Sequence, residues 1–252
     1  MIYITGSSGY IGSRLINKIN EVIHTGNPGN LTGVTIHPVI TCDLKCGLDV
    51  LSYEPKSKID VIYHLAAQAG IPESVEDPIN DARQNILGTL RAIKLANEHN
   101  AKLIFTASAA SLNPESPYGL SKKTAEEYIK MLCNDYVILR LSSIYGKKPV
   151  GVVDNFIRGD KCVIYGDGSA IRDFVHVDDI IEALMMANGW PKGTYDCGSG
   201  VGTRVIDLAE ATGKEIIFEP ERRGEIHESI LENTTPNWNP KIDVINYIKQ
   251  SV

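Results

Sequence analysis

The chain has 252 residues, of which 43% are hydrophobic and 22% are charged, and its net charge is −6 at pH 7. This composition is typical of a soluble globular protein with one large α/β domain or a main domain and a small satellite. The negative charge and the lack of a basic stripe with interleaved aromatics argue against nucleic-acid binding. The start, MIYITGSSGYIG, is unlike a signal peptide, and no stretch approaches the ~20 apolar residues that span a membrane, so we expect a cytoplasmic protein.

The five cysteines form an odd, scattered set: Cys42, Cys46, Cys133, Cys162 and Cys197. Such a set is a poor framework for disulfides and indicates a reducing compartment. Cys42 and Cys46 lack a second cysteine or histidine pair nearby, so no metal site is predicted.

Short apolar runs alternate with longer helical patterns over the first 142 residues. Strands are expected at 1–5, 22–25, 38–42, 61–66, 102–107 and 136–142, and helices at 10–19, 81–99 and 121–134. Nearly continuous apolar strands are typical of a parallel sheet that is covered on both faces. The alternation predicts an α/β fold with a doubly wound parallel sheet of the Rossmann type.

The segment TGSSGYIG (5–12) connects the first expected strand to the first expected helix. Its glycines at positions 6, 9 and 12 would let the backbone turn tightly and approach a pyrophosphate, whose charge the helix N-terminus stabilises. The segment therefore predicts a dinucleotide site on Gly6, Gly9 and Gly12.

Tyr118 and Lys122 lie four positions apart in SPYGLSK (116–122), on one face of an expected helix. A phenol with a pKa of about 10 is a poor base at neutral pH, but a nearby ammonium favours the phenolate. Ser108 follows the strand at 102–107, at the sheet edge where ligands collect. A Tyr–Lys pair alone is usually a helix-surface pair, but together with Ser108 and the glycine loop it predicts acid–base chemistry on an alcohol or ketone.

Several blocks occur in the order typical of the extended short-chain dehydrogenase/reductases. They are the glycine loop, HLAAQAG (64–70), NILGT (85–89), Y-x-x-x-K (118–122), YGDG with RDFVHVDD (165–179) and GSG (198–200). Within that class the chain resembles the NAD-dependent sugar epimerase/dehydratase family. The resemblance and the change of rhythm near residue 147 predict a dinucleotide-binding domain at 1–146, with strand and helix returns from roughly 172–198. A reduced, partly interleaved substrate-binding lobe is expected at 147–252.

The resemblance implies NAD as the cofactor. The implied cofactor-binding residues are Gly6, Gly9, Tyr10, Ile11, Gly12, Asp43, Leu44, Leu65, Ala66, Ala67, Gln68, Tyr118 and Lys122. One departure is Gly26, which would end the second strand, where NAD-binding members carry an acidic residue. Loss of that carboxylate would make NADP possible, although Arg14 is the single arginine placed to reach a 2′-phosphate. We therefore favour NAD.

On the substrate side, the resemblance implies that the ligands are Ser143, Arg172, Arg222 and Glu225. Two arginines suit a diphosphate because each guanidinium can bond two oxygens. Ala109 and Ala110 stand where dehydratases of the family carry Asp-Glu, and neither can move a proton, so dehydration is disfavoured. The segments 147–164 and 109–117 are shorter than usual, which makes a smaller or different substrate possible.

These features predict an NAD-dependent nucleoside-diphosphate-sugar 4-epimerase that acts through a transient 4-keto sugar. An NAD(P)-dependent reductase or dehydrogenase of a keto sugar or small carbonyl is the alternative, favoured by Gly26 and the reduced lobe. A non-enzymatic dinucleotide-binding regulator is a third possibility, which the complete Ser108, Tyr118 and Lys122 set disfavours. Family members pair through two helices, so a homodimer with a four-helix bundle is expected from residues 81–99 and 118–134, with no nucleic-acid or membrane partner.

Overall fold

The computed structural model describes residues 1–25, 39–42, 57–147, 151–221 and 227–252. These residues divide into two compact units, Met1–Arg140 with Ile181–Tyr195 and Leu141–Ile180 with Asp196–Val252. The assignment of a dinucleotide-binding domain to 1–146 and a substrate lobe to 147–252 stays a prediction.

A six-stranded sheet lies mainly in the first unit. Its strands are β1 (Ile2–Thr5), β2 (Val39–Cys42), β3 (Val61–His64), β4 (Lys102–Ser108), β5 (Tyr136–Leu141) and β9 (Gly193–Cys197). They are arranged in the order β2-β1-β3-β4-β5-β9. β1 pairs in parallel with β2 and β3, and β3 pairs in parallel with β4. Every side chain of β1 and β3 is buried, as expected for strands covered on both faces. The predicted parallel α/β sheet is confirmed.

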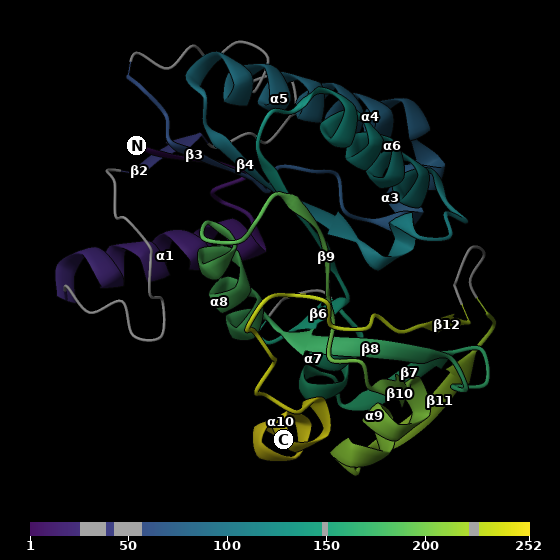
Figure 1. Cartoon of the computed structure of the whole chain (residues 1–252). Coiled ribbons are helices and arrows are strands. Elements are labelled where there is room, and N and C mark those ends of the chain that lie inside the picture. Colours follow the sequence, from purple (N-terminus) through teal and green to yellow (C-terminus); the bar gives the residue numbers. More distant parts are fainter. Residues whose placement is uncertain (26–38, 43–56, 148–150, 222–226) are drawn as a thin grey trace. The chain divides into compact units, whose positions relative to one another are not determined.

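Helices cover both faces of this sheet. They are α1 (Tyr10–Thr25), α3 (Ile71–Glu76), α4 (Pro78–Ala82), the π-helical turn η1 (Arg83–Leu87), α5 (Gly88–His99), the 3₁₀ turn η2 (Ala109–Ser111) and α6 (Pro117–Leu132), and α8 (Val177–Ala187) follows later in the chain. In Figure 1, α5 and α6 lie on one face of the sheet and α1 lies on the other, which is the doubly wound arrangement. The helices expected at 81–99 and 121–134 are confirmed. In the parts of the chain that the structure describes, no helix combines the length and apolar character needed to cross a membrane.

The strand expected at 22–25 is wrong, because these residues form the last turn of α1. Leu15, Ile19 and Val22 are at most 3% exposed and follow the helical spacing of four and then three residues. The next strand among the described residues is β2, which pairs with β1. Gly26, expected at the end of the second strand, lies outside the described residues.

The second unit contains two smaller sheets. β6 (Ser143–Tyr145), β8 (Ile171–His176), β10 (Gly202–Arg204) and β12 (Glu228–Ser229) form a mixed sheet around β8, and β7 (Lys161–Tyr165) pairs in parallel with β11 (Glu215–Glu219). Helices α7 (Val152–Arg158), α9 (Val205–Thr212) and α10 (Val244–Ser251) complete the unit. Its core includes Phe156, Cys162, Ile164, Leu208 and Ile248, all at most 2% exposed.

Candidate functional site

The glycine loop between β1 and α1 requires glycine for two reasons. Gly6 has a φ of +70°, and a Cβ there would lie 2.7 Å from the backbone nitrogen of Ala66. A Cβ on Gly12 would lie 2.1 Å from the carbonyl oxygen of Gly6. The Gly9 amide donates to that same oxygen at 3.0 Å, which closes the turn. The first turn of α1 carries no acidic side chain, so its positive N-terminal dipole faces the loop uncompensated.

A buried chain of hydrogen bonds fixes the end of β3 beside this loop. His64 Nδ1 lies 2.8 Å from Thr5 Oγ1, and His64 Nε2 lies 3.2 Å from Thr89 Oγ1. The Ala66 amide also donates to Thr5 Oγ1, at 3.2 Å. Burial and the charge of Lys122 lower the pKa of His64 to about 3. The imidazole is therefore neutral at ordinary pH and serves as a structural link between β1, β3 and α5.

Gln68 lies at the end of the segment that follows β3. Its amide donates to Asn85 Oδ1 at 2.9 Å, and its side-chain nitrogen donates to the Gly70 carbonyl at 2.9 Å. Its side-chain oxygen is buried and has no hydrogen-bond partner among the described residues. A buried oxygen without a donor is unfavourable, so this position suits a bound polar group. Leu65, Ala66 and Ala67 are half-buried beside it.

The structure brings Ser108, Tyr118 and Lys122 together. Ser108 is the last residue of β4 and Tyr118 is the second residue of α6, and their side chains are hydrogen-bonded. Lys122, one turn further along α6, is 3% exposed. Its ammonium donates to the Thr106 carbonyl at 2.8 Å and lies 4.7 Å from the centre of the Phe105 ring. The four-residue spacing therefore places both side chains against the end of β4.

The sequence predicts that the Lys122 ammonium makes the Tyr118 phenol more acidic, but in the protein alone the pKa of Tyr118 is raised. Burial raises the pKa of Tyr118, the Ser108 hydrogen bond opposes that rise, and the Asp81 carboxylate adds to it. Burial lowers the pKa of Lys122 to about 8, against the opposing effects of Asp81 and Glu126. In the protein alone the phenol is thus a weaker acid than free tyrosine, although its partner remains mostly charged at pH 7.

Both backbone groups of Tyr118 are held by serines. The Tyr118 amide donates to Ser74 Oγ of α3 at 3.1 Å, and the Tyr118 carbonyl accepts from Ser121 Oγ at 3.0 Å. Ser116 caps the helix by accepting from the Gly119 amide at 3.2 Å, and proline occupies the first turn. A Cβ on Gly119 would lie 2.6 Å from the Ala110 carbonyl oxygen, so only glycine lets η2 approach α6 this closely.

Sequence reasoning missed a buried polar cluster behind this group. The side-chain nitrogen of Asn85 lies 2.9 Å from Asp81 Oδ1, 3.0 Å from Ser121 Oγ and 3.1 Å from the Gln68 carbonyl. Asp81, Asn85 and Ser121 are each at most 3% exposed. Asn85 is the first residue of the NILGT block, which the resemblance to the family singles out. No pattern in the sequence indicates that Asp81 is buried.

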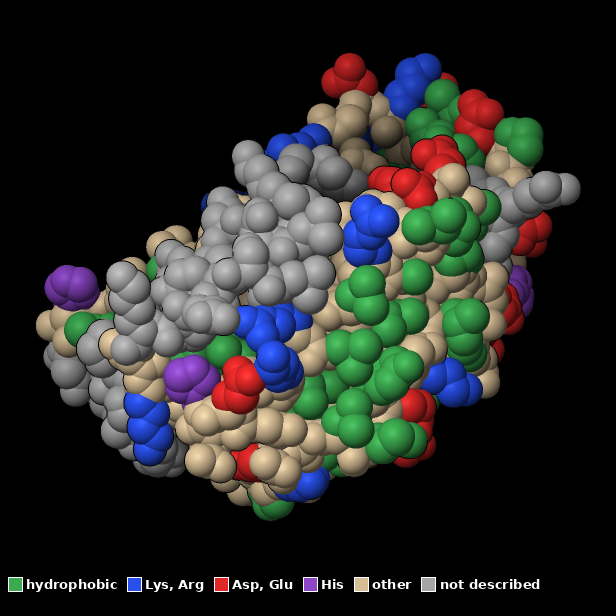
Figure 2. All heavy atoms as spheres, turned by 90° about the horizontal axis from the view of Figure 1, so that it is seen from above, with side chains coloured by type: hydrophobic (Ala, Val, Ile, Leu, Met, Phe, Trp, Pro, Cys, Tyr) green, Lys and Arg blue, Asp and Glu red, His purple; other side chains and the backbone are tan. Residues whose placement is uncertain are grey.

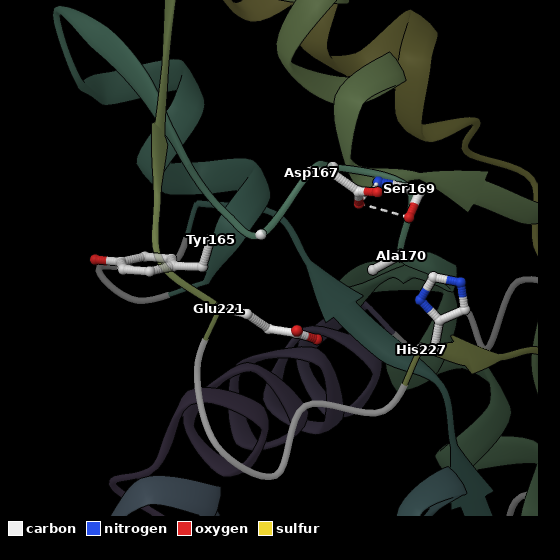
Figure 3. Close-up of a pocket in the computed structure, with 8 residues that line it drawn as sticks. Tyr165, Asp167, Ser169, Ala170, Glu221 and His227 are labelled. Atoms are coloured by element: carbon white, nitrogen blue, oxygen red, sulfur yellow. Dashed lines mark hydrogen bonds between the residues drawn. The ribbon is translucent and has the colours of Figure 1, made fainter.

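The second unit contains a cavity of about 310 Å³. It is lined by Tyr165, Gly166, Asp167, Gly168, Ser169, Ala170, Glu221 and His227. Figure 3 shows the hydrogen bond between two of them, in which the Ser169 hydroxyl donates to Asp167 Oδ1 at 2.6 Å. Glu221 and His227 flank the segment 222–226 in the sequence. That segment contains the predicted ligands Arg222 and Glu225, which, like Asp43 and Leu44, lie outside the described residues.

The other two predicted substrate ligands belong to this second unit. Arg172, on β8, donates from Nη1 to the Ile171 carbonyl at 2.9 Å and to the carbonyl of the cavity residue His227 at 3.2 Å. Ser143 begins β6 and is paired with Phe174 of β8. Arg172 is thus bonded to a wall of the cavity, and Ser143 lies on the neighbouring strand.

Comparison with known proteins identifies the family. The model of the NAD dependent epimerase/dehydratase family matches residues 2–198. A UDP-glucose 4-epimerase of Mycolicibacterium smegmatis is 30% identical, and the match covers 99% of this chain and 96% of that protein. The structure of UDP-glucose 4-epimerase from Thermotoga maritima with UDP-glucose is 27% identical with a TM-score of 0.78, covering 99% of this chain and 96% of that one. The Thermus thermophilus UDP-glucose 4-epimerase complex with NAD is also 27% identical with a TM-score of 0.78, covering 99% and 97%. The chain belongs to the NAD dependent epimerase/dehydratase family.

Proposed function

We propose that the protein is an NAD-dependent nucleoside-diphosphate-sugar 4-epimerase. The observation that carries the proposal is the convergence of Ser108, Tyr118 and Lys122 at the end of β4. Ala109 and Ala110 are the first two residues of η2, immediately after Ser108. Because neither alanine can exchange a proton, the arrangement supports oxidation and reduction at one carbon and disfavours loss of water.

The residues present fit NAD. Gly6 and Gly12 leave room that a Cβ would fill, and the buried oxygen of Gln68 lacks a partner among the described residues. With NAD bound, the site would gain a reversible hydride acceptor. Arg14 is engaged by Tyr10: it lies 4.2 Å from the ring centre and donates to the Tyr10 carbonyl at 3.1 Å. This engagement, together with the NAD in the related structure from Thermus thermophilus, favours NAD over NADP.

The proton chemistry is assigned to two side chains. Tyr118 accepts the proton of the sugar C4 hydroxyl and returns it after the sugar has turned over. Ser108 hydrogen-bonds to the same sugar oxygen and to Tyr118, which favours the phenolate. Lys122 supplies positive charge beside the phenol and is fixed by the Thr106 carbonyl. Since burial raises the pKa of Tyr118, the protein relies on these partners, and on the positive nicotinamide ring, to make the phenol a base at neutral pH.

The substrate is proposed to be a nucleotide sugar, as in the relative that was solved with UDP-glucose. Arg172 and Arg222 are the proposed diphosphate ligands, Ser143 contacts the sugar or diphosphate, and Glu225 accepts from the nucleotide ribose. The cavity beside His227 supports this role for the second unit, because Arg172 is bonded to its wall. Each arginine can donate two parallel hydrogen bonds to phosphate oxygens.

The deciding experiment is to identify the cofactor that the denatured protein releases and to assay UDP-sugars without added cofactor. Near-stoichiometric NAD and interconversion of a 4-epimer pair are the expected results, since an epimerase consumes no net hydride. The alternative is an NAD(P)-dependent reductase or dehydrogenase of a keto sugar or small carbonyl compound, which the short α7 of seven residues favours. An empty cofactor site, with stoichiometric NADPH consumption on a carbonyl substrate, would establish that alternative.

We also propose that the protein forms a homodimer through α4, α5 and α6. Figure 2 shows apolar side chains gathered on the face that these helices present. Exposed apolar residues on this part of the chain are Ile79, Leu87, Leu120, Tyr128, Met131 and Leu132. A second copy would cover such a face, in agreement with the expected four-helix bundle. Met131 is 78% exposed, so Met131→Glu should shift the molar mass measured by light scattering from dimer to monomer. A monomeric wild type would contradict this assembly.

A further inference from the structure

A buried carboxylate lies behind the proposed acid–base pair. Asp81, on α4, is 1% exposed, and it accepts a hydrogen bond from the side chain of Asn85 at 2.9 Å. The same Asn85 nitrogen lies 3.0 Å from Ser121 Oγ, and Ser121 directly precedes Lys122 in α6. A carboxylate with so little exposure is unfavourable unless a cation or hydrogen bonds compensate it. Packing alone therefore does not explain why a carboxylate occupies position 81.

The charges around Asp81 point to Lys122. Asp81 and Lys122 are both at most 3% exposed, and the hydrogen bonds from Asn85 to Asp81 and to Ser121 bring Asp81 against the turn of α6 that carries Lys122. The positive charge of Lys122 lowers the pKa of Asp81, and the Asp81 charge in turn raises the pKa of Lys122. Glu126 also faces Lys122, but it is bonded by Arg140 Nε and Nη2 at 2.8–3.1 Å, so much of its charge is already neutralised. His64 faces Lys122 from β3 and remains neutral. Asp81 is thus a buried negative charge that favours the protonated form of Lys122.

We propose that Asp81 is a positioning residue that keeps the Lys122 ammonium charged beside Tyr118, with Asn85 holding its carboxylate. This inference deepens the proposed epimerase function and rests on it for the catalytic consequence. Asp81 touches neither reacting atom and acts through Lys122 and Tyr118.

The direction of the effect follows from the charges. A negative Asp81 raises the pKa of Lys122 and also that of Tyr118, because it favours the proton on both groups. Removing that charge should lower both pKa values. Lys122 already has a pKa of about 8 because of burial, so a further fall would leave it neutral at physiological pH.

The first test measures Lys122 directly and needs no activity. Lysine labelled with ¹³C at Cε is incorporated into the full chain, Lys122→Met identifies the signal, and NMR follows it against pH. Wild type should titrate near 8, with a second, small inflection at acid pH where Asp81 takes up a proton. Asp81→Asn keeps the size and the acceptor oxygen of the side chain, and it should lower the Lys122 midpoint by about one pH unit or more and remove the acid inflection.

Asp77→Asn is the matched control. Asp77 is an exposed N-cap of α4 that accepts from the Asn80 amide at 2.9 Å, and asparagine caps helices about as well as aspartate. This variant should leave the Lys122 titration unchanged. An unchanged midpoint in Asp81→Asn would overturn the proposal. Should Asp81→Asn fail to fold by circular dichroism, the wild-type curve still decides, because a Lys122 signal without the acid inflection would contradict the coupling.

The second test is the pH profile of epimerisation. Because Asp81 raises both pKa values, Asp81→Asn should move both limbs of the profile to lower pH. A loss of turnover equal at every pH would indicate a structural role only and would overturn the inference. If the wild type epimerises no nucleotide sugar, the proposed function fails, whereas the NMR shift still shows whether Asp81 controls Lys122.

Discussion

The polar side chains behind the proposed acid–base pair and those around the cavity of the second unit differ in how deeply they are buried. In the first unit, Asp81, Asn85, Ser121 and Lys122 are at most 3% exposed, and each is fixed by partners from other elements or its own helix. In the second unit, the polar residues around the cavity are largely exposed, and Asp167 is bonded to the nearby Ser169.

This difference in burial suits the two sets of polar residues to different roles. Buried polar groups have strong, geometry-dependent interactions, so they fix protonation and distance, and changes there are costly. Exposed groups interact weakly with their own protein and remain available to a ligand, so changes there should alter what is bound without altering the fold. The substitutions below test this division, beginning with the largest expected effect.

Tyr118→Phe removes the proposed proton acceptor and keeps the ring. Turnover should fall by about 10²–10⁴-fold, the range that general acid–base catalysis contributes. Cofactor content and melting temperature should remain close to wild type, because both backbone bonds of Tyr118 persist. Retention of most of the activity in a coupled epimerase assay would show that another group is the base.

Gly12→Ala places a Cβ 2.1 Å from the Gly6 carbonyl oxygen. The overlap should lower the free energy of unfolding by about 1–3 kcal/mol and reduce the cofactor retained on purification. Gly88→Ala is the matched control, since its φ is −58° and its Cβ meets no atom within 4 Å. That variant should be stabilised by about 0.5–1 kcal/mol in a urea titration. Equal behaviour of the two variants would refute the close approach at Gly12.

Arg172→Gln tests the second unit. Loss of a charge-assisted hydrogen bond to phosphate of about 1.5–3 kcal/mol should raise KM about ten- to a hundredfold and leave kcat little changed. Arg204→Gln is the control, because Arg204 is an exposed arginine paired with Asp207 at 2.5 Å. Steady-state kinetics with UDP-sugars provide the measurement. A fall in kcat alone would place Arg172 nearer to the chemistry than proposed.

His64 predicts a pH dependence of stability. Its pKa is about 3 in the folded protein and about 6.5 when unfolded, so between these values only the unfolded chain binds the proton. The free energy of unfolding should therefore fall as pH decreases from 6.5 towards 3, by up to about 1.4 kcal/mol per unit from this group. His64→Gln should flatten the slope in denaturant titrations. An identical slope in the variant would mean that the buried imidazole takes up a proton in the folded state.

The sheet and the glycine loop could be predicted because their signals are local. A Gly-rich turn between an apolar strand and a helix constrains the backbone by itself, and the structure has this turn at Gly6 and Gly12. The juxtaposition of Ser108 with Tyr118 also followed from position, since a strand end and the next helix start are separated by a short loop.

Other features could not be predicted, for identifiable reasons. Val22 and Ile23 are β-branched and suggested a strand, but the helical spacing of Leu15, Ile19 and Val22 outweighs that preference. Asp81 resembles a surface residue in sequence. It is buried because α4 packs against α6, a contact that its own segment does not encode.

Gly119 controls the separation between Ser108 and Tyr118 in this site. Because the Ala110 carbonyl approaches the start of α6 so closely, the separation between Ser108 and Tyr118 is determined by contact between main chains. Any side chain at position 119 would push the helix away and lengthen the hydrogen bond between them. The distance between Ser108 and Tyr118 therefore depends on the absence of a side chain at position 119.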